Sequence, residues 1–307
     1  MTQTRITILL CTFNGAANLD AQLQSYLAQT HQAWDLWVSD DGSTDGTRAI
    51  LDQFCRDHSI GRNIRILDGP RRGSTVKYMT LLCHPDLPPG PVALSDQDDV
   101  WMPQKLSRAL AALGHVDGVA LYGAQSLHTD QSLRVVGQSI PMPRTPCFGN
   151  ALVQNIVSGH SAALSTDALK LVRRAGIPHG VPYHDWWLYL LVSGAGGTVV
   201  IDPEPVLFYR QHTTNAMGAH RGMSAHINRL KLFIGHHFAD WLTANIAALT
   251  LVEHLLSGPN KAALAQLRAH PRQRRLGRTF AFSRCGIKRQ RWAATALIYF
   301  AVMLGRA

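Results

Sequence analysis

The most informative segment of the chain is Val92-Ala-Leu-Ser-Asp-Gln-Asp-Asp-Val-Trp-Met-Pro103. Its apolar start, residues 92–94, is typical of the end of a buried strand. Asp96 and Asp98 follow at once, and because side chains two apart in an extended segment point the same way, we expect their carboxylates to converge. Two converging carboxylates repel each other unless a cation lies between them. The pair therefore predicts a site for Mg²⁺ or Mn²⁺, which favour oxygen ligands.

A plainer interpretation of this stretch is a polar turn before a helix, with Asp99 as the N-cap residue. A lone Asp-X-Asp pattern favours the turn over a metal site. The choice depends on whether other polar clusters of the chain are expected at the same place in the fold.

Composition places the chain among globular proteins. It has 307 residues, of which 46% are hydrophobic, enough for one large α/β domain or for one domain with an extension. The five cysteines include no Cys-X-X-Cys pair, which argues against a disulfide framework or a zinc site and favours a reducing cytoplasm. We expect neither a signal peptide nor a transmembrane segment, since no apolar run is long enough.

The net charge of +10 is concentrated in the last third of the chain. Residues 1–215 contain 16 Lys/Arg and 18 Asp/Glu, whereas residues 216–307 contain 14 Lys/Arg and only 2 Asp/Glu. This asymmetry predicts an anionic partner for the last third, and an anionic membrane surface fits better than nucleic acid because few aromatic residues are interleaved with the charges. A solvated pair of basic helices is the alternative.

The first hundred residues alternate between strand and helix patterns. Strands are expected at 5–11, 34–39 and 63–67, with a fourth that ends with residues 92–94 and leads into Asp96, and helices are expected at 18–30, 47–58 and 73–82. This order predicts a mainly parallel sheet with helices on both faces, in which ligands bind at the carboxyl ends of the strands. The polar clusters Thr12–Asn14, Asp40–Asp45 and Asp96–Asp99 all follow strands, so we expect them to form one site.

The rest of the chain has shorter elements and then only helices. Helices are expected at 105–113, 166–175, 186–193, 225–237, 239–256, 261–269 and 292–304, strands at 116–122, 197–201 and 206–210, an edge hairpin at 125–136, and strand plus turn at 156–164. The Pro-rich segment 141–150 predicts a mobile flap or an acceptor loop. Residues 272–291 form a basic stretch without an assigned element.

Five motifs, in this order along the chain, resemble the family 2 glycosyltransferases of the GT-A fold. They are Thr12-Phe-Asn, Asp40-Asp-Gly-Ser-Thr-Asp, Ser95-Asp-Gln-Asp-Asp-Val-Trp, His184-Asp-Trp-Trp and Tyr209-Arg-Gln-His-Thr-Thr-Asn-Ala-Met-Gly. The third and fifth are similar to a bacterial subgroup that includes rhamnosyltransferases of polysaccharide assembly. The resemblance covers about residues 5–218. It implies a GT-A (Rossmann-like), mainly parallel mixed sheet flanked by helices, followed by an all-helical C-terminal extension.

The resemblance implies a site for a nucleotide-sugar donor. The residues implied for the nucleotide are Thr12, Phe13, Asn14, Asp40, Asp41 and Asp96, with Asp41 at the base and Asp40 at the ribose. The ligands implied for Mg²⁺ or Mn²⁺ are Asp96, Asp98 and His212. A helix-capping loop at Asp40–Asp41 and an ordinary surface position for His212 are the alternatives.

The resemblance also implies a catalytic base, Asp185, at the start of a helix. A carboxylate at a helix N-terminus is favoured in its charged form, so an apolar surrounding would be needed to raise its basicity; an ordinary N-cap aspartate is the alternative. The residues implied for the diphosphate, donor sugar or acceptor are Arg210, Gly159, His160, Trp101 and Trp186. The chain departs from the family at Lys77 or Tyr78, where an Asn is common, and at His184, where many relatives have Glu.

Together these features predict a metal-dependent, inverting glycosyltransferase. It would move one sugar from dTDP-rhamnose or a UDP-sugar to a hydroxyl of a cell-surface polysaccharide or lipid-linked glycan. We expect a GT-A domain at 1–218, with a nucleotide-binding half at about 1–100 and an acceptor half at about 101–218, and a basic helical extension at 219–307. The expected location is cytoplasmic, at the inner face of the membrane.

Two other functions remain open at this point. A sugar-phosphate nucleotidyltransferase would share an α/β nucleotide-binding fold, but the turn at Thr12-Phe-Asn-Gly-Ala-Ala lacks the cationic residues that such enzymes place there. A catalytically inactive, glycosyltransferase-like tethering protein would use the basic last third to bind a partner. The full set of Asp96, Asp98 and Asp185 argues against loss of activity.

Overall fold

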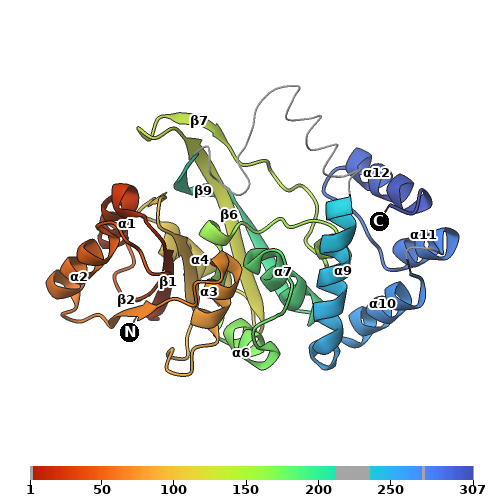
Figure 1. Ribbon diagram of the computed structural model, residues 1–307, viewed down its shortest axis with the longest axis horizontal. Coiled ribbons are helices and arrows are strands. Elements are labelled where there is room, and N and C mark those ends of the chain that lie inside the picture. The colour runs from red at the N-terminus through yellow and green to blue at the C-terminus, as the bar shows by residue number, and fades with distance from the viewer. Residues whose placement is uncertain (1–2, 212–235, 272–273, 307) are drawn as a thin grey trace.

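The computed structural model of the protein describes residues 3–211, 236–271 and 274–306. In these ranges one mixed, nine-stranded sheet runs in the order β3-β2-β1-β4-β8-β6-β9-β5, with β7 paired to β6. The strands are β1 (Ile6–Thr12), β2 (Trp34–Asp40), β3 (Ile64–Asp68), β4 (Val92–Asp96), β5 (Val100–Trp101), β6 (Ala120–Thr129), β7 (Val135–Gln138), β8 (Ala163–Leu164) and β9 (Thr198–Arg210). The predicted α/β class, with helices flanking a mainly parallel sheet, is confirmed (Figure 1).

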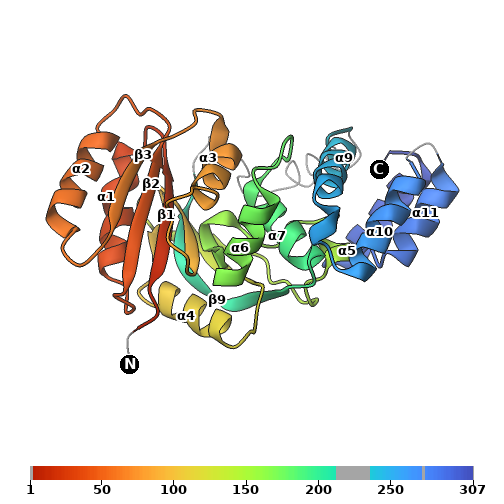
Figure 2. The same ribbon diagram turned by 90° about the horizontal axis from the view of Figure 1, so that it is seen from below.

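The first four of these strands, β1 to β4, form the parallel part of the sheet. Their helices are α1 (Ala16–Leu27), α2 (Thr47–His58) and α3 (Gly73–Leu82). Because side chains alternate along a strand, Ile8 and Leu10 of β1 join the core with α1 and α2, whereas Leu9 joins the core with α3. Figure 2 shows α1 and α2 on one side of the sheet and α3 on the other. The predicted strand–helix alternation is therefore confirmed.

The second half of the sheet is mixed. Strand β8 pairs antiparallel with β4 and β6, β6 pairs parallel with β9, and β5 pairs antiparallel with β9. The prediction of two strands at 197–201 and 206–210 is wrong, because β9 continues through both. Pro203 and Pro205 lie between the two predicted strands, and a register shift accommodates them. Asp202 holds this irregular segment by accepting hydrogen bonds from Arg108 and from the Tyr122 hydroxyl, all at 2.7–2.8 Å.

The shorter helices of this half are α4 (Lys105–Gly114), α5 (Phe148–Ala151), the 3₁₀ turn η1 (Gly159–Ser161), α6 (Thr166–Ala175) and α7 (His184–Gly194). The strand expected at 116–122 starts later and extends through the first part of the predicted hairpin, which β7 completes. The end of the Pro-rich segment is the buried helix α5. Nearer its start, the segment is bound to the C-terminal part of the chain, because the backbone N–H of Arg144 donates to the Gln290 side chain at 2.8 Å.

Helices alone make up the described C-terminal part. They are α9 (His236–Leu251), η2 (Glu253–Leu255), α10 (Gly258–Ala269), α11 (Arg275–Arg284) and α12 (Trp292–Met303). Helix α11 lies in the basic stretch to which the sequence assigned no element; its apolar Ala281 and Phe282 are buried. The helix predicted at 225–237 and the boundary at 218 lie at least partly outside the described residues.

One hydrophobic core joins the sheet to the C-terminal helices. It includes Leu9 of β1, Trp187 of α7, Leu249 of α9 and Val302 of α12. Helix α9 lies between α7 and the helices α10 to α12 (Figures 1 and 2). The domain boundary at 218 stays a prediction. The described residues before and after it share one hydrophobic core. In the described ranges, no helix combines the length and apolar character required to cross a bilayer.

A close approach between α5 and the turn after α11 yields a test of this shared core. A Cβ atom at Gly149 would lie 2.5 Å from the carbonyl oxygen of Gly286 and 2.8 Å from that of Cys285. Since backbone atoms cannot move aside cheaply, we expect Gly149→Ala to lower the free energy of unfolding by about 1–3 kcal/mol, as overpacking does. Gly114→Ala is the control, because a Cβ there would meet no atom within 4 Å. Equal stability of both variants in urea unfolding would contradict the shared core.

Candidate active site

The candidate site lies at the carboxyl ends of the parallel strands. Strand register sets Thr12 opposite Asp40, and Asp96 opposite Cys11, the residue before Thr12. The three polar clusters singled out in the sequence therefore meet at one edge of the sheet. This is the position at which open α/β sheets bind ligands.

Asp40 anchors the loop that follows β2. Its carboxylate accepts hydrogen bonds from the Thr12 hydroxyl at 2.8 Å and from the hydroxyl and backbone N–H of Ser43 at 2.6 and 2.9 Å. Burial raises the pKa of Asp40, but the hydrogen bonds from Ser43 and Thr12 outweigh burial, and the pKa is lowered. Asp40 is thus a fixed anion at the strand end.

Asp41 forms a buried ion pair with Lys77 of α3. The Lys77 ammonium lies 3.1 Å from the Asp41 carboxylate, and the side chains are 6% and 9% exposed. Lys77 also donates to the carbonyl oxygen of Thr12 at 2.8 Å, and the second Asp41 oxygen accepts from the backbone N–H of Arg71 at 3.0 Å. One lysine therefore connects the ends of β1 and β2 to α3.

Phe13 and Asn14 form the turn between β1 and α1. The Phe13 ring is 53% exposed, and its backbone N–H and C=O are both bound by the side-chain amide of Gln97, at 2.8 and 3.1 Å. Asn14 has a positive φ of 47°, and its side-chain oxygen accepts from the backbone N–H of Thr44 at 2.9 Å. The turn is thus fixed to the loops after β2 and β4, with the aromatic ring left accessible.

Asp96, at the end of β4, is linked to the start of α7 through Tyr78. The Tyr78 hydroxyl donates to the Asp96 carboxylate at 2.7 Å, and its ring stacks on that of His184 with centroids 4.0 Å apart. Burial, and then the charge of Asp98, raise the pKa of Asp96. Burial lowers the pKa of His184 to about 4, so this imidazole is neutral at pH 7.

Asp185 is held in one orientation by the backbone. One carboxylate oxygen accepts from the N–H of Gly159 at 3.0 Å and the other from the N–H of Trp186 at 2.7 Å. The cap position of α7 is Tyr183, so the N-cap alternative for Asp185 is wrong. Burial raises the pKa of Asp185 to about 6 in spite of these hydrogen bonds. A Cβ at Gly159 would lie 2.6 Å from the His184 ring, so a side chain there would displace that ring.

A second group of possible metal ligands includes Asp99. Asp96 and Asp99 each contribute a carboxylate oxygen and His160 contributes a ring nitrogen, and these three atoms lie within 4.8 Å of one another. The Arg210 backbone amide lies near Asp99, yet no described residue makes a hydrogen bond of ordinary geometry to either Asp99 oxygen or to Nε2 of His160. Burial raises the pKa of Asp99 well above its usual range and lowers that of His160 to about 3.

Lys105 provides a positive charge beside this group. Its ammonium donates to the carbonyl oxygen of His160 and lies 3.6 Å from the Trp101 ring centroid. Burial lowers its pKa, and the charges of Asp99 and Asp96 oppose that change. The cap position of α4 is Gln104, so the interpretation of Asp99 as a simple N-cap is wrong.

The other predicted residues are buried at the edges of this arrangement. Trp101 is 2% exposed and Trp186 is 5% exposed, with the indole N–H of Trp186 donating to the carbonyl oxygen of Ala151 at 2.6 Å. Arg210 is 7% exposed, and its guanidinium donates to the carbonyl oxygen of Gln131. His212 lies outside the described residues. The roles predicted for these side chains stay predictions.

Sequence reasoning missed four side chains that build the site: Tyr78, Gln97, Asp99 and Lys105. Signals existed for two of them. Gln97 and Asp99 stand within the motif that suggested the site, but only its first two aspartates, Asp96 and Asp98, were interpreted as ligands. Tyr78 was noted only as a departure from the family. For Lys105 there was no signal, because its burial follows from the packing of α4 against β6 and β9.

Comparison with known proteins identifies the class. The family model of glycosyl transferase family 2 matches residues 7–169, more than half of the chain. The chain therefore belongs to glycosyl transferase family 2, and the resemblance stated from its motifs is confirmed.

Two curated relatives illustrate the range within the family. The dTDP-rhamnosyl transferase RfbG of Shigella flexneri is 25% identical over 227 residues, which cover 73% of this chain and 78% of the relative. The UDP-Glc:alpha-D-GlcNAc-diphosphoundecaprenol beta-1,3-glucosyltransferase WfgD of Escherichia coli is 25% identical over 135 residues, which cover 42% of this chain and 48% of the relative.

Solved structures of similar fold include two with nucleotide sugars. TarS of S. aureus, residues 1–349 in complex with UDP-GlcNAc, has a TM-score of 0.55 at 14% identity and covers 91% of this chain and 90% of its own. The mannosyltransferase PcManGT of Pyrobaculum calidifontis, in complex with GDP-Man and Mn²⁺, has a TM-score of 0.55 at 19% identity. The match covers 97% of this chain and 88% of the PcManGT chain. The expected GT-A fold is confirmed.

The buried ion pair of Asp41 and Lys77 yields a test of how the site is held. Lys77→Met leaves the Asp41 carboxylate buried without its cation, so we expect the free energy of unfolding to fall by about 3–5 kcal/mol. The matched control is Lys170→Met, which removes an exposed ion pair with Asp167 and should cost about 1 kcal/mol or less. Urea unfolding of both variants measures the difference, and similar losses would show that the pair does not hold the strand ends.

Proposed function

We propose that the protein is an inverting glycosyltransferase that adds a single sugar to a cell-surface polysaccharide or a lipid-linked glycan. Membership of glycosyl transferase family 2 supports the transfer of a sugar from a nucleotide sugar. The observation that carries the proposal is Asp185, a carboxylate fixed by two backbone amides, with a pKa near 6. The stack of Tyr78 on His184 connects this carboxylate to Asp96 at the strand end.

Asp185 is proposed as the general base. A base works best when its pKa lies near the operating pH, because it is then both deprotonated and basic enough to accept a proton. In the proposed reaction Asp185 takes the proton of the acceptor hydroxyl while the acceptor oxygen attacks the anomeric carbon. The bond to the nucleoside diphosphate breaks on the opposite face, so the configuration inverts without a covalent enzyme intermediate.

Mg²⁺ or Mn²⁺ is the proposed cofactor. Asp96 and Asp98 would hold it, with His212 as a further ligand, and Asp99 and His160 offer alternative donor atoms. The fit of the residues is supported by the Asp99 oxygens and the His160 nitrogen, which lack hydrogen-bond partners among the described residues, and by the preference of these ions for carboxylate ligands. When bound, a divalent cation supplies charge stabilisation for the leaving diphosphate.

The rest of the donor site is proposed from the strand ends. The exposed Phe13 ring and the anions Asp40 and Asp41 would contact the base and ribose, while Gly159, His160, Trp101, Trp186 and Arg210 would shape the donor-sugar, diphosphate or acceptor side. A dTDP-rhamnose donor is supported by the similarity to RfbG, and a UDP-sugar by the similarity to WfgD. We place the reaction at the inner face of the cytoplasmic membrane, with the basic last third facing anionic lipid and no nucleic-acid partner.

A donor panel tests the nucleotide and metal sites together. Thermal unfolding is measured with UDP, dTDP, GDP and CDP, each with and without Mn²⁺ or Mg²⁺. We expect one nucleotide to raise the Tm, and only when metal is present. At a hundredfold excess of nucleotide over its Kd, the free energy of unfolding should rise by about 2.7 kcal/mol. Asp98→Ala should lose this metal-dependent shift, whereas Asp167→Ala on the surface should keep it. Absence of any nucleotide effect would contradict the donor site.

The pH profile tests Asp185 as the base. With the donor that the panel identifies, release of nucleoside diphosphate is measured with water as the acceptor. Because a raised pKa keeps Asp185 protonated and inactive below about pH 6, we expect kcat/KM to rise with pH and level off above about pH 7. Asp185→Asn should lower the rate by about 10²–10⁴-fold while the nucleotide-dependent Tm shift remains.

The matched control for Asp185→Asn is Asp167→Asn, which changes an aspartate in the first turn of α6 instead of α7. Its rate and pH profile should equal those of the wild type. A pH-independent rate, or an active Asp185→Asn variant, would assign the base to another residue.

A further inference from the structure

The last described helix, α12, is apolar on every side. Its twelve residues include no charged side chain. Ile298 and Val302 face inward and are 2% and 0% exposed. On the other side, Trp292, Phe300 and Met303 are 76%, 54% and 47% exposed. A helix that is hydrophobic all round is normally buried, so this exposed apolar stripe calls for a partner.

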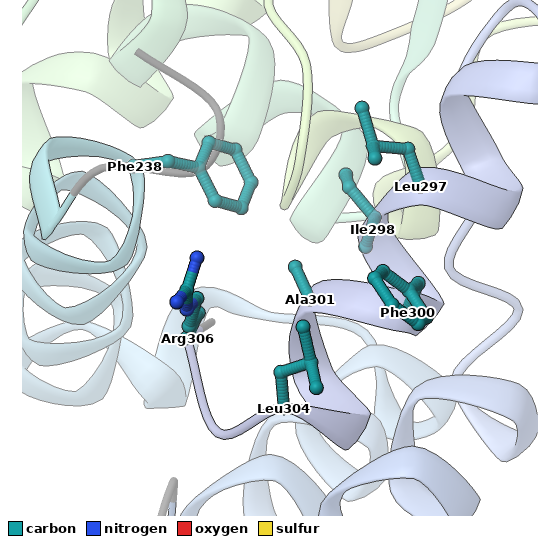
Figure 3. Close-up of a pocket in the computed structure, with 7 residues that line it drawn as sticks. All are labelled: Phe238, Leu297, Ile298, Phe300, Ala301, Leu304 and Arg306. Atoms are coloured by element: carbon teal, nitrogen blue, oxygen red, sulfur yellow. The ribbon is translucent and has the colours of Figure 1, made fainter. Parts of the chain in front are cut away.

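An apolar pocket lies beside the stripe, between α12 and α9. Its cavity volume is about 80 Å³, roughly half that of the apolar cavity of about 150 Å³ that holds a benzene molecule. Figure 3 shows its lining, which consists of Phe238, Leu297, Ile298, Phe300, Ala301, Leu304 and Arg306. Phe300 belongs to both the stripe and the pocket. The pocket is large enough for the end of one hydrocarbon chain and has a single charged residue, Arg306, in its lining.

All charged residues of the described segment that contains α12 are positive. Residues 274–306 contain eight Lys/Arg and no Asp/Glu. The exposed ones are Arg274, Arg275, Arg284, Lys288, Arg291 and Arg306. Arg291 directly precedes α12, and Arg306 follows it closely. The helix is thus an apolar segment with a cation near each end.

This charge pattern decides which partner fits. In a symmetric dimer the same patch of each copy would meet, and two copies of a segment that has eight Lys/Arg and no Asp/Glu would repel each other. An anionic bilayer supplies both negative phosphates for the arginines and hydrocarbon for the stripe. At 1.5 Å per residue, α12 is about 18 Å long, so it is suited to lie along the membrane surface.

We propose that α12 lies in the headgroup region of an anionic phospholipid bilayer. The stripe of Trp292, Phe300 and Met303 enters the acyl boundary, the pocket receives the end of one acyl chain, and Arg291 and Arg306 bind lipid phosphates. This inference rests on the proposed function, because a lipid-linked acceptor would be presented at the same surface. It adds which helix makes the contact and how that helix is oriented.

Tryptophan fluorescence offers a site-specific test. Of the seven tryptophans, Trp34, Trp37, Trp101, Trp186 and Trp187 are buried, Trp241 is partly buried, and only Trp292 is exposed. The full chain is mixed with vesicles of phosphatidylcholine alone or with 30% phosphatidylglycerol, and binding is measured by cosedimentation. We expect binding only to the anionic vesicles, with a blue shift of emission and quenching by lipids brominated in the acyl chain. Trp292→Phe should still bind but lose the blue shift.

Paired variants separate the two parts of the surface. We expect Phe300→Ser with Met303→Ser, and separately Arg291→Glu with Arg306→Glu, each to weaken vesicle binding on the order of tenfold or more. The controls change equally accessible residues elsewhere: Ile60→Ser, at a position that is 92% exposed, and Arg174→Glu. Both should bind vesicles like the wild type.

Three results would overturn the proposal: no binding to anionic vesicles, binding without a change at Trp292, or variants that alter only a dimer seen by analytical ultracentrifugation. Nucleotide-dependent thermal shifts measured without vesicles keep the two proposals apart. If the α12 variants retain these shifts while vesicle binding fails in all proteins, the membrane inference is wrong and the donor site stands. If the protein binds anionic vesicles but no nucleotide, the donor site is wrong and the membrane inference stands.

Discussion

Burial of negative charge at the end of β4 is the constraint on which the site depends. Asp96, Asp99 and Asp185 all have a pKa raised first of all by burial. An ionised carboxylate in such a place costs free energy unless hydrogen bonds or cations compensate. The protein supplies part of the compensation through Tyr78, Lys105 and two backbone amides. Among the described residues, the two Asp99 oxygens and Nε2 of His160 receive no hydrogen bond of ordinary geometry, a pattern that is more typical of a binding site than of a satisfied polar core.

The two faces of the sheet are covered by different parts of the chain. The core that includes Ile8 and Leu10 is closed by α1, α2 and α4, all close in sequence to the parallel strands. The opposite core, which includes Leu9 and Trp187, also requires α9 and α12. Asp185 lies in the first turn of α7, a helix whose residues are almost all buried. The orientation of the proposed base therefore depends on packing that extends into the C-terminal helices.

The sequence was sufficient for the parallel half of the fold, because strand and helix periods alternate there and each motif follows a strand. It placed Asp40, Asp96 and the neighbouring turn at one edge correctly as positions in the sheet. It could not reveal the Asp41–Lys77 pair or the Tyr78–His184 stack, since both join residues far apart in the chain through side-chain packing. It also predicted two strands where the structure has only β9, because a register shift in the segment held by Asp202 preserves one strand.

The hydrogen bond between the Arg144 backbone and the side chain of Gln290 joins residues 146 positions apart in the chain. During synthesis, the helices that cover the second core emerge long after the sheet that they cover. Residues of this core that pack against the C-terminal helices therefore keep part of their apolar surface unprotected until those helices have left the ribosome. Such a delay is the period in which a nascent chain aggregates or recruits a chaperone. The large sequence separation of these contacting residues thus lengthens the period in which the nascent chain is prone to aggregation.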